Sequence, residues 1–261
     1  MIPIGDDLPT LRRPIVTYAI IAATAAAWLL FQGAGFNPIT LAGSLCNLGL
    51  VPGELSHRAP LGLAVPLGYG LQCVVDNEPI NWLTPVTSMF LHGSWGHILG
   101  NLLFFYVFGN NVEDSMGHAR FAIFYLICGL AAAAVHVLFN PTSPVPTVGA
   151  SGAISGVMGA YLMLYPRARI KMLFPFLIIF PVLRIQAWLV LLWWFAWQVV
   201  AWLPELTSMR REVSGGVAVG AHVGGFLAGV LLIRLFANPR LVDAHHTTYG
   251  DNLGYRWRRG Q

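Results

Sequence analysis

Residues 147–159 read TVGASGAISGVMG, and this stretch of small and apolar residues contains no charged side chain. Gly152, Gly156 and Ala160 recur at intervals of four, so they share one face of a helix. A stripe of small residues lets two helix backbones approach closely inside a membrane. The stretch therefore predicts a membrane helix that packs tightly against a neighbour.

The whole chain has the composition of a membrane protein. Of its 261 residues, 56% are hydrophobic and only 10% are charged, whereas an ordinary soluble domain has about 25% charged residues. The formal net charge is +4, and the basic residues lie at the ends of apolar runs. This pattern is typical of membrane proteins and unlike the basic stripe of a nucleic-acid-binding protein. We therefore expect an all-α polytopic membrane protein in contact with the lipid bilayer, with no nucleic-acid partner.

Six apolar runs are long enough to be transmembrane helices, since about 20 apolar residues cross a hydrocarbon core of about 30 Å. They lie at about 14–32, 95–112, 119–139, 149–166, 185–203 and 215–236. The stretch 170–182 is also apolar, but Pro175 and Pro181 interrupt it. We expect it to be an interfacial or re-entrant segment, and a seventh short crossing is the alternative.

The distribution of basic residues predicts the orientation of these spans, because Lys and Arg favour the cytoplasmic side. With the N-terminus inside, all but three of the 15 Lys and Arg residues lie in inside segments, the exceptions being Arg58, Arg210 and Arg211. Six spans then place both termini in the cytoplasm.

Three parts follow from this topology. Residues 1–13 form a cytoplasmic N-terminal segment, residues 14–236 a six-helix membrane domain, and residues 237–261 a basic cytoplasmic tail that we expect to be mobile. The N-terminus has no Arg- and Ser-rich transit pattern, so we expect a bacterial inner membrane.

The first outside loop, at about 33–92, is unusually long. Loops beyond about 12–15 residues tend to be functional or to contain structure of their own. Cys46 and Cys73 lie in this loop, and in an oxidising compartment they could form a disulfide. Two reduced, buried thiols are the alternative. Cys128 and His136 lie together in a later span, where we expect both to be packing residues.

Ser151 and His222 are reactive polar residues in two glycine-rich spans, and polar groups at membrane depth are functional candidates by default. Pro144 and Pro146 precede Ser151, which places it near a helix start, where free backbone N–H groups attract negative charge. His222 is expected about two turns below the outer end of its span. Each has an alternative when taken alone, namely a packing face for Ser151, and interhelical bonding or ligation of haem or metal for His222.

The two residues are more informative together. Gly225 and Gly229 continue the helix face of His222, so both spans carry small residues that permit close approach. A histidine beside a serine can act as general base and release the hydroxyl as a nucleophile. His97 and Asn101 lie four apart on one helix face and could direct donors at the developing oxyanion. Interhelical hydrogen bonding is the structural alternative for that pair.

The acidic residues limit the chemistry further. No Asp or Glu lies in the interior of any predicted span. A Ser-His-Asp triad within the membrane is therefore excluded, and so is a pair of aspartates that share one proton. The sequence also lacks the HExxH zinc motif. If the chain is a serine hydrolase, it therefore uses a Ser-His dyad, which needs neither a metal nor an organic cofactor.

Four motifs, in this order along the chain, resemble those of the rhomboid family of intramembrane serine proteases. They are HxxxN at His97 and Asn101, GxxxExxxG centred on Glu113, GASG around Ser151, and AHxxGxxxG at residues 221–229. The resemblance covers about residues 85–235 and implies a rhomboid-like six-transmembrane-helix bundle. It also implies a serine endopeptidase that hydrolyses peptide bonds in or near the transmembrane segments of membrane protein substrates.

The resemblance implies roles for individual residues. Ser151 would be the nucleophile and His222 the general base. The oxyanion hole would be formed by His97, Asn101, Gly149 and the backbone N–H of Ser151. Structural roles would fall to Glu113, as an anchor at the inner end of its span, and to Gly225 and Gly229.

The resemblance implies two further assignments. The loop 204–214 would cap the site, and the span 185–203, with Trp193, Trp194 and Trp197, would be a lateral gate for the substrate. Aromatic residues near a span end are also typical of the ordinary interfacial belt.

The sequence departs from the family at one point. Many members carry a Trp-Arg pair in the first outside loop, but here Trp82 is followed by Leu83. The departure leaves open how this loop is held. The alternative function is a catalytically inactive rhomboid-like protein that binds membrane clients, and a histidine-based transporter or haem protein is a more distant one. The sequence does not set the oligomeric state.

Overall fold

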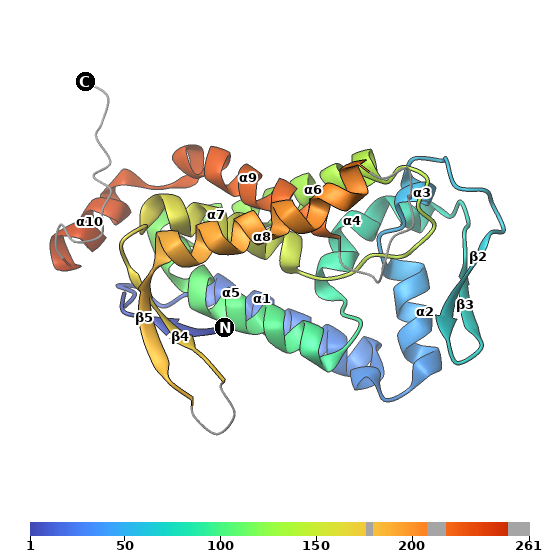
Figure 1. Ribbon diagram of the computed structural model, residues 1–261, viewed down its shortest axis with the longest axis horizontal. Helices are drawn as coiled ribbons and strands as arrows, with labels where there is room; N and C mark the ends of the chain where they lie inside the picture. The colour runs from blue at the N-terminus through green and yellow to red at the C-terminus, as the bar shows by residue number, and fades with distance from the viewer. Residues whose placement is uncertain (176–179, 208–217, 250–261) are drawn as a thin grey trace.

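A computed structural model describes residues 1–175, 180–207 and 218–249 of the chain (Figure 1). It is mostly helical, as predicted. Six helices coincide with the six predicted spans: α1 Ile15–Ala26, α5 Trp95–Met116, α6 His118–Phe139, α7 Ser151–Leu164, α8 Ala187–Thr207 and α9 Val219–Phe236. A π-helical turn, Ala27–Phe31, extends α1 toward the length of the first predicted span.

Within the described ranges, three helices are by themselves long and apolar enough to cross a membrane, namely α6, α9 and the part of α8 from Ala187 to Pro204. The apolar helices Ile15–Phe31 and α7 are shorter. Helix α5 is 22 residues long, but its last turns contain asparagines and acidic residues that lower its hydropathy. The two carboxylates are bonded to the N-terminal part of the chain: Glu113 accepts from the Val16 and Thr17 N–H groups, and Asp114 accepts from the Leu11 N–H.

Helix α7 lies at the centre of the bundle, and residues 152–161 are all buried. The backbone at Gly152 and Gly156 contacts α9, as predicted, while the Cβ positions of both glycines face Ala132 and Cys128 of α6. A Cβ atom added to Gly225 would meet the carbonyl oxygen of Gly152, and one added to Gly229 would meet that of Gly156. The two helix backbones are therefore in direct contact, which only glycine at these positions permits.

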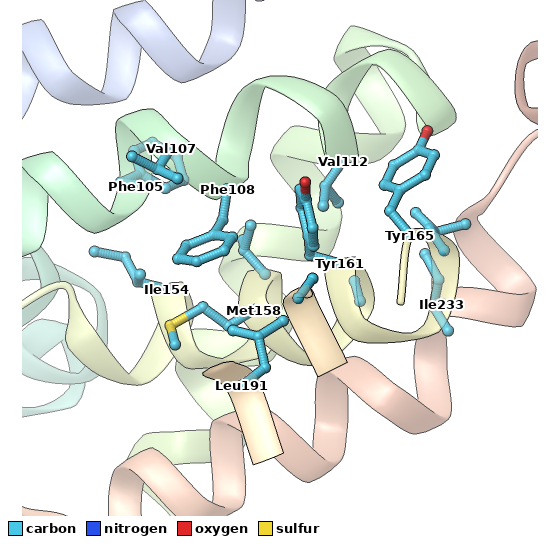
Figure 2. Packing of buried hydrophobic residues seen from close by; sticks show 14 of the residues in the cluster. Phe105, Val107, Phe108, Val112, Ile154, Met158, Tyr161, Tyr165, Leu191 and Ile233 are labelled. Carbon is cyan, nitrogen blue, oxygen red and sulfur yellow. The ribbon is translucent and has the colours of Figure 1, made fainter. Parts of the chain in front are cut away.

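Aromatic side chains fill the bundle on the other faces of α7 (Figure 2). Phe108 of α5 meets Tyr161 of α7 edge to face, with 5.1 Å between the ring centroids, and Phe105 stacks on Phe121 of α6. Lipid tails are as apolar as these side chains, so the helices are held by close packing rather than by removal from water.

A small antiparallel sheet corrects the expectation for residues 170–182. Strands β4 (Arg169–Leu173) and β5 (Val182–Gln186) form a hairpin, and β1 (Ile2–Asp6) from the N-terminal segment pairs with the outer edge of β4. The described residues of the segment therefore form a hairpin and not a membrane-crossing helix, residues 176–179 lie outside the described part of the chain, and the interfacial placement stays a prediction. Its two prolines lie between the strands, where no ladder hydrogen bond needs their missing N–H groups.

Asp6 fastens this sheet to the bundle. Its Oδ2 accepts hydrogen bonds of 2.7 Å from the Tyr161 hydroxyl on α7 and from the Asn111 side chain on α5. Burial raises the pKa of Asp6 to about 6, against the smaller lowering effect of these hydrogen bonds. The N-terminal segment is thus an integral part of the fold.

The long loop 33–92 has structure of its own, at the end of the molecule opposite the β4–β5 hairpin (Figure 1). It contains helices α2 (Pro38–Leu48), α3 (Pro52–Leu55) and α4 (Thr84–Thr87), and a hairpin of β2 (Ala64–Gly68) and β3 (Leu71–Val74). The disulfide that the sequence left open is present, and it joins Cys46 of α2 to Cys73 of β3.

The segment after Asn238 differs from the mobile tail that we expected. Helix α10 (Pro239–Tyr249) follows α9 almost at once, and the Asn238 N–H donates to the carbonyl of Ser115 on α5 over 2.9 Å. His245 is buried, with its Nε2 3.4 Å from the Asp114 carboxylate. Buried polar contacts hold this helix in place. The rest of the predicted tail, 250–261, lies outside the described residues.

Candidate active site

Ser151 is the first residue of α7, as the upstream prolines predicted. Ala150, directly before it, is in the αR region, and Gly149 has a φ of 130°, a region that favours glycine. At the start of a helix the backbone N–H groups have no partner within the helix. The Ser151 side chain therefore lies beside free backbone donors.

His222 lies next to Ser151, on the neighbouring helix. Its Nε2 is 2.7 Å from the Ser151 Oγ. His222 is the fourth residue of the described α9, which begins at Val219. It is thus in the first turn of this helix, rather than two turns below its outer end. The expectation placed it too deep because the predicted span began at 215, and residues 215–217 lie outside the described part of the chain.

The other ring nitrogen of His222 has a partner that the sequence analysis missed. Nδ1 lies 2.9 Å from Oε1 of Gln198 on α8. Trp194, one turn earlier on α8, places its ring 6.0 Å from the imidazole. The available signal was a lone amide side chain in an otherwise apolar span, because polar groups at membrane depth need a partner.

His97 and Asn101 come from the first two turns of α5. Both line a cavity of about 300 Å³ together with Ser151, His222 and Trp194. Asn101 is buried and donates one amide hydrogen to the His97 carbonyl over 3.1 Å, and its second amide hydrogen has no acceptor among the residues that the structure describes. The structure therefore brings the four predicted polar residues to one cavity.

The N–H of Gly149, which we expected in the oxyanion hole, is already bonded, and this glycine has another role. Its N–H already donates to the carbonyl of Ser88 over 2.9 Å. A Cβ atom at this position would lie 2.8 Å from Nε2 of His97. Gly149 thus leaves room for the His97 ring beside Ser151, while its own N–H ties the segment before Ser151 to Ser88.

The segment before Ser151 is held by the long outer loop. Leu50 and Thr147 exchange two backbone hydrogen bonds of 2.9 and 2.8 Å, and the Gly53 N–H donates to the Ser143 carbonyl. The Thr147 hydroxyl also lies 2.9 Å from Nε2 of His136 on α6. His136 therefore has a specific partner beyond the packing role that we expected.

These contacts also explain how the outer loop is held although Leu83 replaces the arginine of the Trp-Arg pair. Trp82 is largely exposed, with 66% of its surface accessible, and its ring lies 6.0 Å from that of His57 in the same loop. The Cys46–Cys73 disulfide and the paired backbone of Leu50 supply the anchors.

Glu113, near the C-terminal end of α5, is buried and holds the start of α1. Its carboxylate accepts hydrogen bonds from the backbone N–H groups of Val16 and Thr17 and from the Thr17 hydroxyl, all at 2.7–2.9 Å. His118 also contacts it through Nδ1. A carboxylate at free helix N–H groups is a favourable cap.

The structure describes the whole of the predicted gate but only the first residues of the predicted cap. Trp193, Trp194 and Trp197 line a second cavity of about 730 Å³ between α5 and α8. Only 17% of the apolar stretch of α8 is buried, against 39% in α6 and in α9. In the predicted cap 204–214, residues 204–207 continue α8, and residues 208–214 lie outside the described part of the chain.

Comparison with known proteins agrees with the four motifs. Residues 79–239 match the family model of the Rhomboid domain. The chain is 31% identical to "Rhomboid-like protein 11, chloroplastic" of Arabidopsis thaliana over 60% of this chain and 53% of that protein. It is 28% identical to "RHOMBOID-like protein 5" of the same plant over 90% of this chain and 75% of that protein. A shorter match, 37% identical, covers 31% of this chain and 15% of "Rhomboid protease GluP" of Bacillus subtilis.

The matches to the chloroplast protein and to the Bacillus protease cover only part of each relative. The aligned part spans about half of the chloroplast protein and a smaller part of the Bacillus protease. The family match includes His97, Asn101, Ser151 and His222, while most of the outer loop before α4 lies ahead of it.

Proposed function

Because this chain belongs to the rhomboid family of helical integral membrane proteins, we propose that it is a serine endopeptidase that cleaves membrane proteins in or near their transmembrane segments. The observation that carries the proposal is the 2.7 Å separation of Ser151 Oγ and His222 Nε2 beside a cavity within the helix bundle. No acidic residue is needed as a third member of the site.

The reaction follows from this pair. His222 Nε2 takes the proton of the Ser151 hydroxyl as Oγ attacks the peptide carbonyl carbon. The tetrahedral intermediate collapses when the C–N bond breaks, and the imidazolium gives its proton to the leaving amine. Water then hydrolyses the acyl ester on Ser151, with His222 again as general base. No metal or organic cofactor is required for these steps.

The negative charge of the tetrahedral oxygen needs donors. Three groups lie around the cavity for this purpose: the second amide hydrogen of Asn101, the ring of His97, and the backbone N–H of Ser151. Fixed donors of this kind lower the barrier because they need no reorganisation when the charge appears.

The substrate is a transmembrane segment of another protein. A helical segment hides its carbonyl groups in hydrogen bonds, so it must unwind locally before Ser151 can attack one. Small or helix-breaking residues near the cut reduce this cost. Helix α8 is the least buried of the three long apolar helices, and the cavity that it forms with α5 makes it the proposed lateral gate.

The proposed orientation of the chain is supported by the distribution of charge and by the disulfide. Arg and Lys residues gather at the β4–β5 end, which is the proposed cytoplasmic side, and both termini are proposed to lie there. Cys46–Cys73 lies at the opposite end and suits an oxidising compartment. A bacterial inner membrane has these two sides.

A client-binding protein without catalytic activity is the second candidate. It would retain the helix bundle and the gate but would need no bonded serine and histidine. A serine and a histidine held at hydrogen-bonding distance, with donors around the same cavity, favour the enzyme.

The experiment is proteolysis in proteoliposomes. The substrates are single-span proteins, one set with Gly, Ala and Pro in the transmembrane segment and a matched set with leucine there. Wild-type protein should cleave the first set, whereas Ser151→Ala and His222→Ala should not. Ser155→Ala, which removes another α7 hydroxyl, is the matched control and should cleave. Binding of the substrates without cleavage by wild-type protein would support the client-binding protein instead.

A further inference from the structure

His222 is bonded at both ring nitrogens. Nε2 lies 2.7 Å from Ser151 Oγ, and Nδ1 lies 2.9 Å from Gln198 Oε1. A neutral imidazole donates at one nitrogen and accepts at the other. To accept the Ser151 proton, Nε2 must be free of hydrogen, so the hydrogen must reside on Nδ1. That hydrogen then needs an acceptor, and Oε1 of Gln198 lies at the right distance.

Gln198 lies on α8, whose other residues along the apolar stretch are aliphatic or aromatic. A polar amide on such a helix is costly unless it is satisfied within the protein. Trp194 lies four positions earlier, so it shares the helix face of Gln198 and contacts the same imidazole. One face of α8 thus borders the His222 ring with an aromatic plane and an acceptor.

We propose that Gln198 is a positioning residue for His222, whose side-chain carbonyl selects the imidazole tautomer that presents an unprotonated Nε2 to Ser151. This inference rests on the proposed hydrolysis by Ser151 and His222. The amide takes the orienting place that a carboxylate has in a Ser-His-Asp triad, and it does so without a buried negative charge.

An amide does not fix the His222 tautomer completely, because it can rotate and offer its NH2 group to Nδ1 instead. The ring would then hold its hydrogen on Nε2 and could not accept the serine proton. Glutamate of the same length can only accept when ionised, and methionine of similar length offers no comparable acceptor. The variants Gln198→Glu and Gln198→Met therefore separate orientation from packing.

The first measurement is the rate of covalent labelling of Ser151 by a fluorophosphonate probe as a function of pH, on detergent-solubilised full-length protein. Loss of an orienting partner typically reduces activity about 10–100-fold, and we expect a reduction of that order for Gln198→Met. Gln198→Glu should keep labelling, but the acid limb of its pH profile should move to higher pH, because a neighbouring carboxylate favours the protonated imidazole. His97 on α5 and His136 on α6 are the other titratable groups that act on His222 among the described residues, and both variants leave them unchanged.

The chain offers a matched control. Gln186, just before α8, also accepts a hydrogen bond from a ring N–H, that of Trp188, over 2.6 Å. Gln186→Met removes the same side chain and the same kind of bond far from His222, so its labelling rate and pH profile should equal those of wild type. Equal rates and equal profiles in Gln198→Met and wild type would overturn the inference.

A second measurement does not depend on activity. The ¹⁵N chemical shifts of the His222 ring distinguish a hydrogen on Nδ1 from one on Nε2, with His222→Ala to assign the signal. We expect the Nδ1–H form in wild type and a shift toward Nε2–H in Gln198→Met. An Nε2–H form in wild type would overturn the inference. If the Nδ1–H form is found and Ser151 still fails to label, the proposed hydrolysis is wrong, while the orienting bond stands.

Discussion

Ser151 Oγ and His222 Nε2 lie 2.7 Å apart although 71 positions separate the two residues in the chain. The backbone contact between α7 and α9 produces this proximity. Gly225, one turn after His222, meets the carbonyl of Gly152, which directly follows Ser151, so the distance between the reactive side chains depends on a glycine at position 225. Close helix packing is therefore a condition for the proposed chemistry.

The glycine contact predicts the effect of Gly229→Ala. The new Cβ would meet the carbonyl oxygen of Gly156, which is backbone and cannot rotate away. Overpacking of this kind destabilises by about 1–3 kcal/mol, so the melting temperature of the solubilised protein should fall, and labelling of Ser151 should fall with it. Gly43→Ala is the matched control, since this glycine of α2 has open space around its Cβ position. An unchanged melting temperature in Gly229→Ala would show that the helices can separate without loss.

The disulfide predicts a thiol count and a stability change. Cys46 and Cys73 are bonded and Cys128 is free. Denatured, unreduced protein should therefore show one reactive thiol, and reduced protein all three. Removal of a disulfide typically lowers stability by about 2–4 kcal/mol, so reductant should lower the melting temperature of wild type. The double variant Cys46→Ala/Cys73→Ala is the control, because reductant should change it no further; three reactive thiols before reduction would contradict the pairing.

Asp6 predicts a pH dependence of stability. Burial raises its pKa from an ordinary value of 3.8 to about 6, so the folded state holds this proton more tightly than the unfolded state does. The stabilising contribution is complete below about pH 4 and is lost as the pH rises through about 6. Melting temperatures of wild type and Asp6→Asn between pH 4 and pH 7 provide the measurement. The decline with rising pH should be smaller in Asp6→Asn than in Asp7→Asn, the adjacent control, and equal declines would refute this assignment.

Much of the fold could be predicted from the sequence because its signals are local. Long apolar runs located the helices, and the Gly152 and Gly156 stripe correctly indicated where two backbones meet. The four polar residues of the cavity were found because polar groups inside a membrane are rare. These features depend on composition and helical spacing alone.

The remaining features depend on contacts between distant segments. Strand β1 is recognisable only beside β4, whose partners lie more than 160 positions away. The orienting bond from Gln198 and the contact between His136 and Thr147 depend on how helices face one another, which spacing within one helix does not determine. The expectation of a mobile tail was wrong for α10 because contacts with α5 hold that helix.

The most direct test of the central claim is fluorophosphonate labelling of purified protein, with the modified residue located by mass spectrometry. The set consists of wild type, Ser151→Ala, His222→Ala and the control Ser155→Ala. The account predicts an adduct on Ser151 in wild type and in Ser155→Ala, none in Ser151→Ala, and a strongly reduced yield in His222→Ala. Equal labelling of all four proteins, or no adduct on Ser151 of folded wild type, would contradict it.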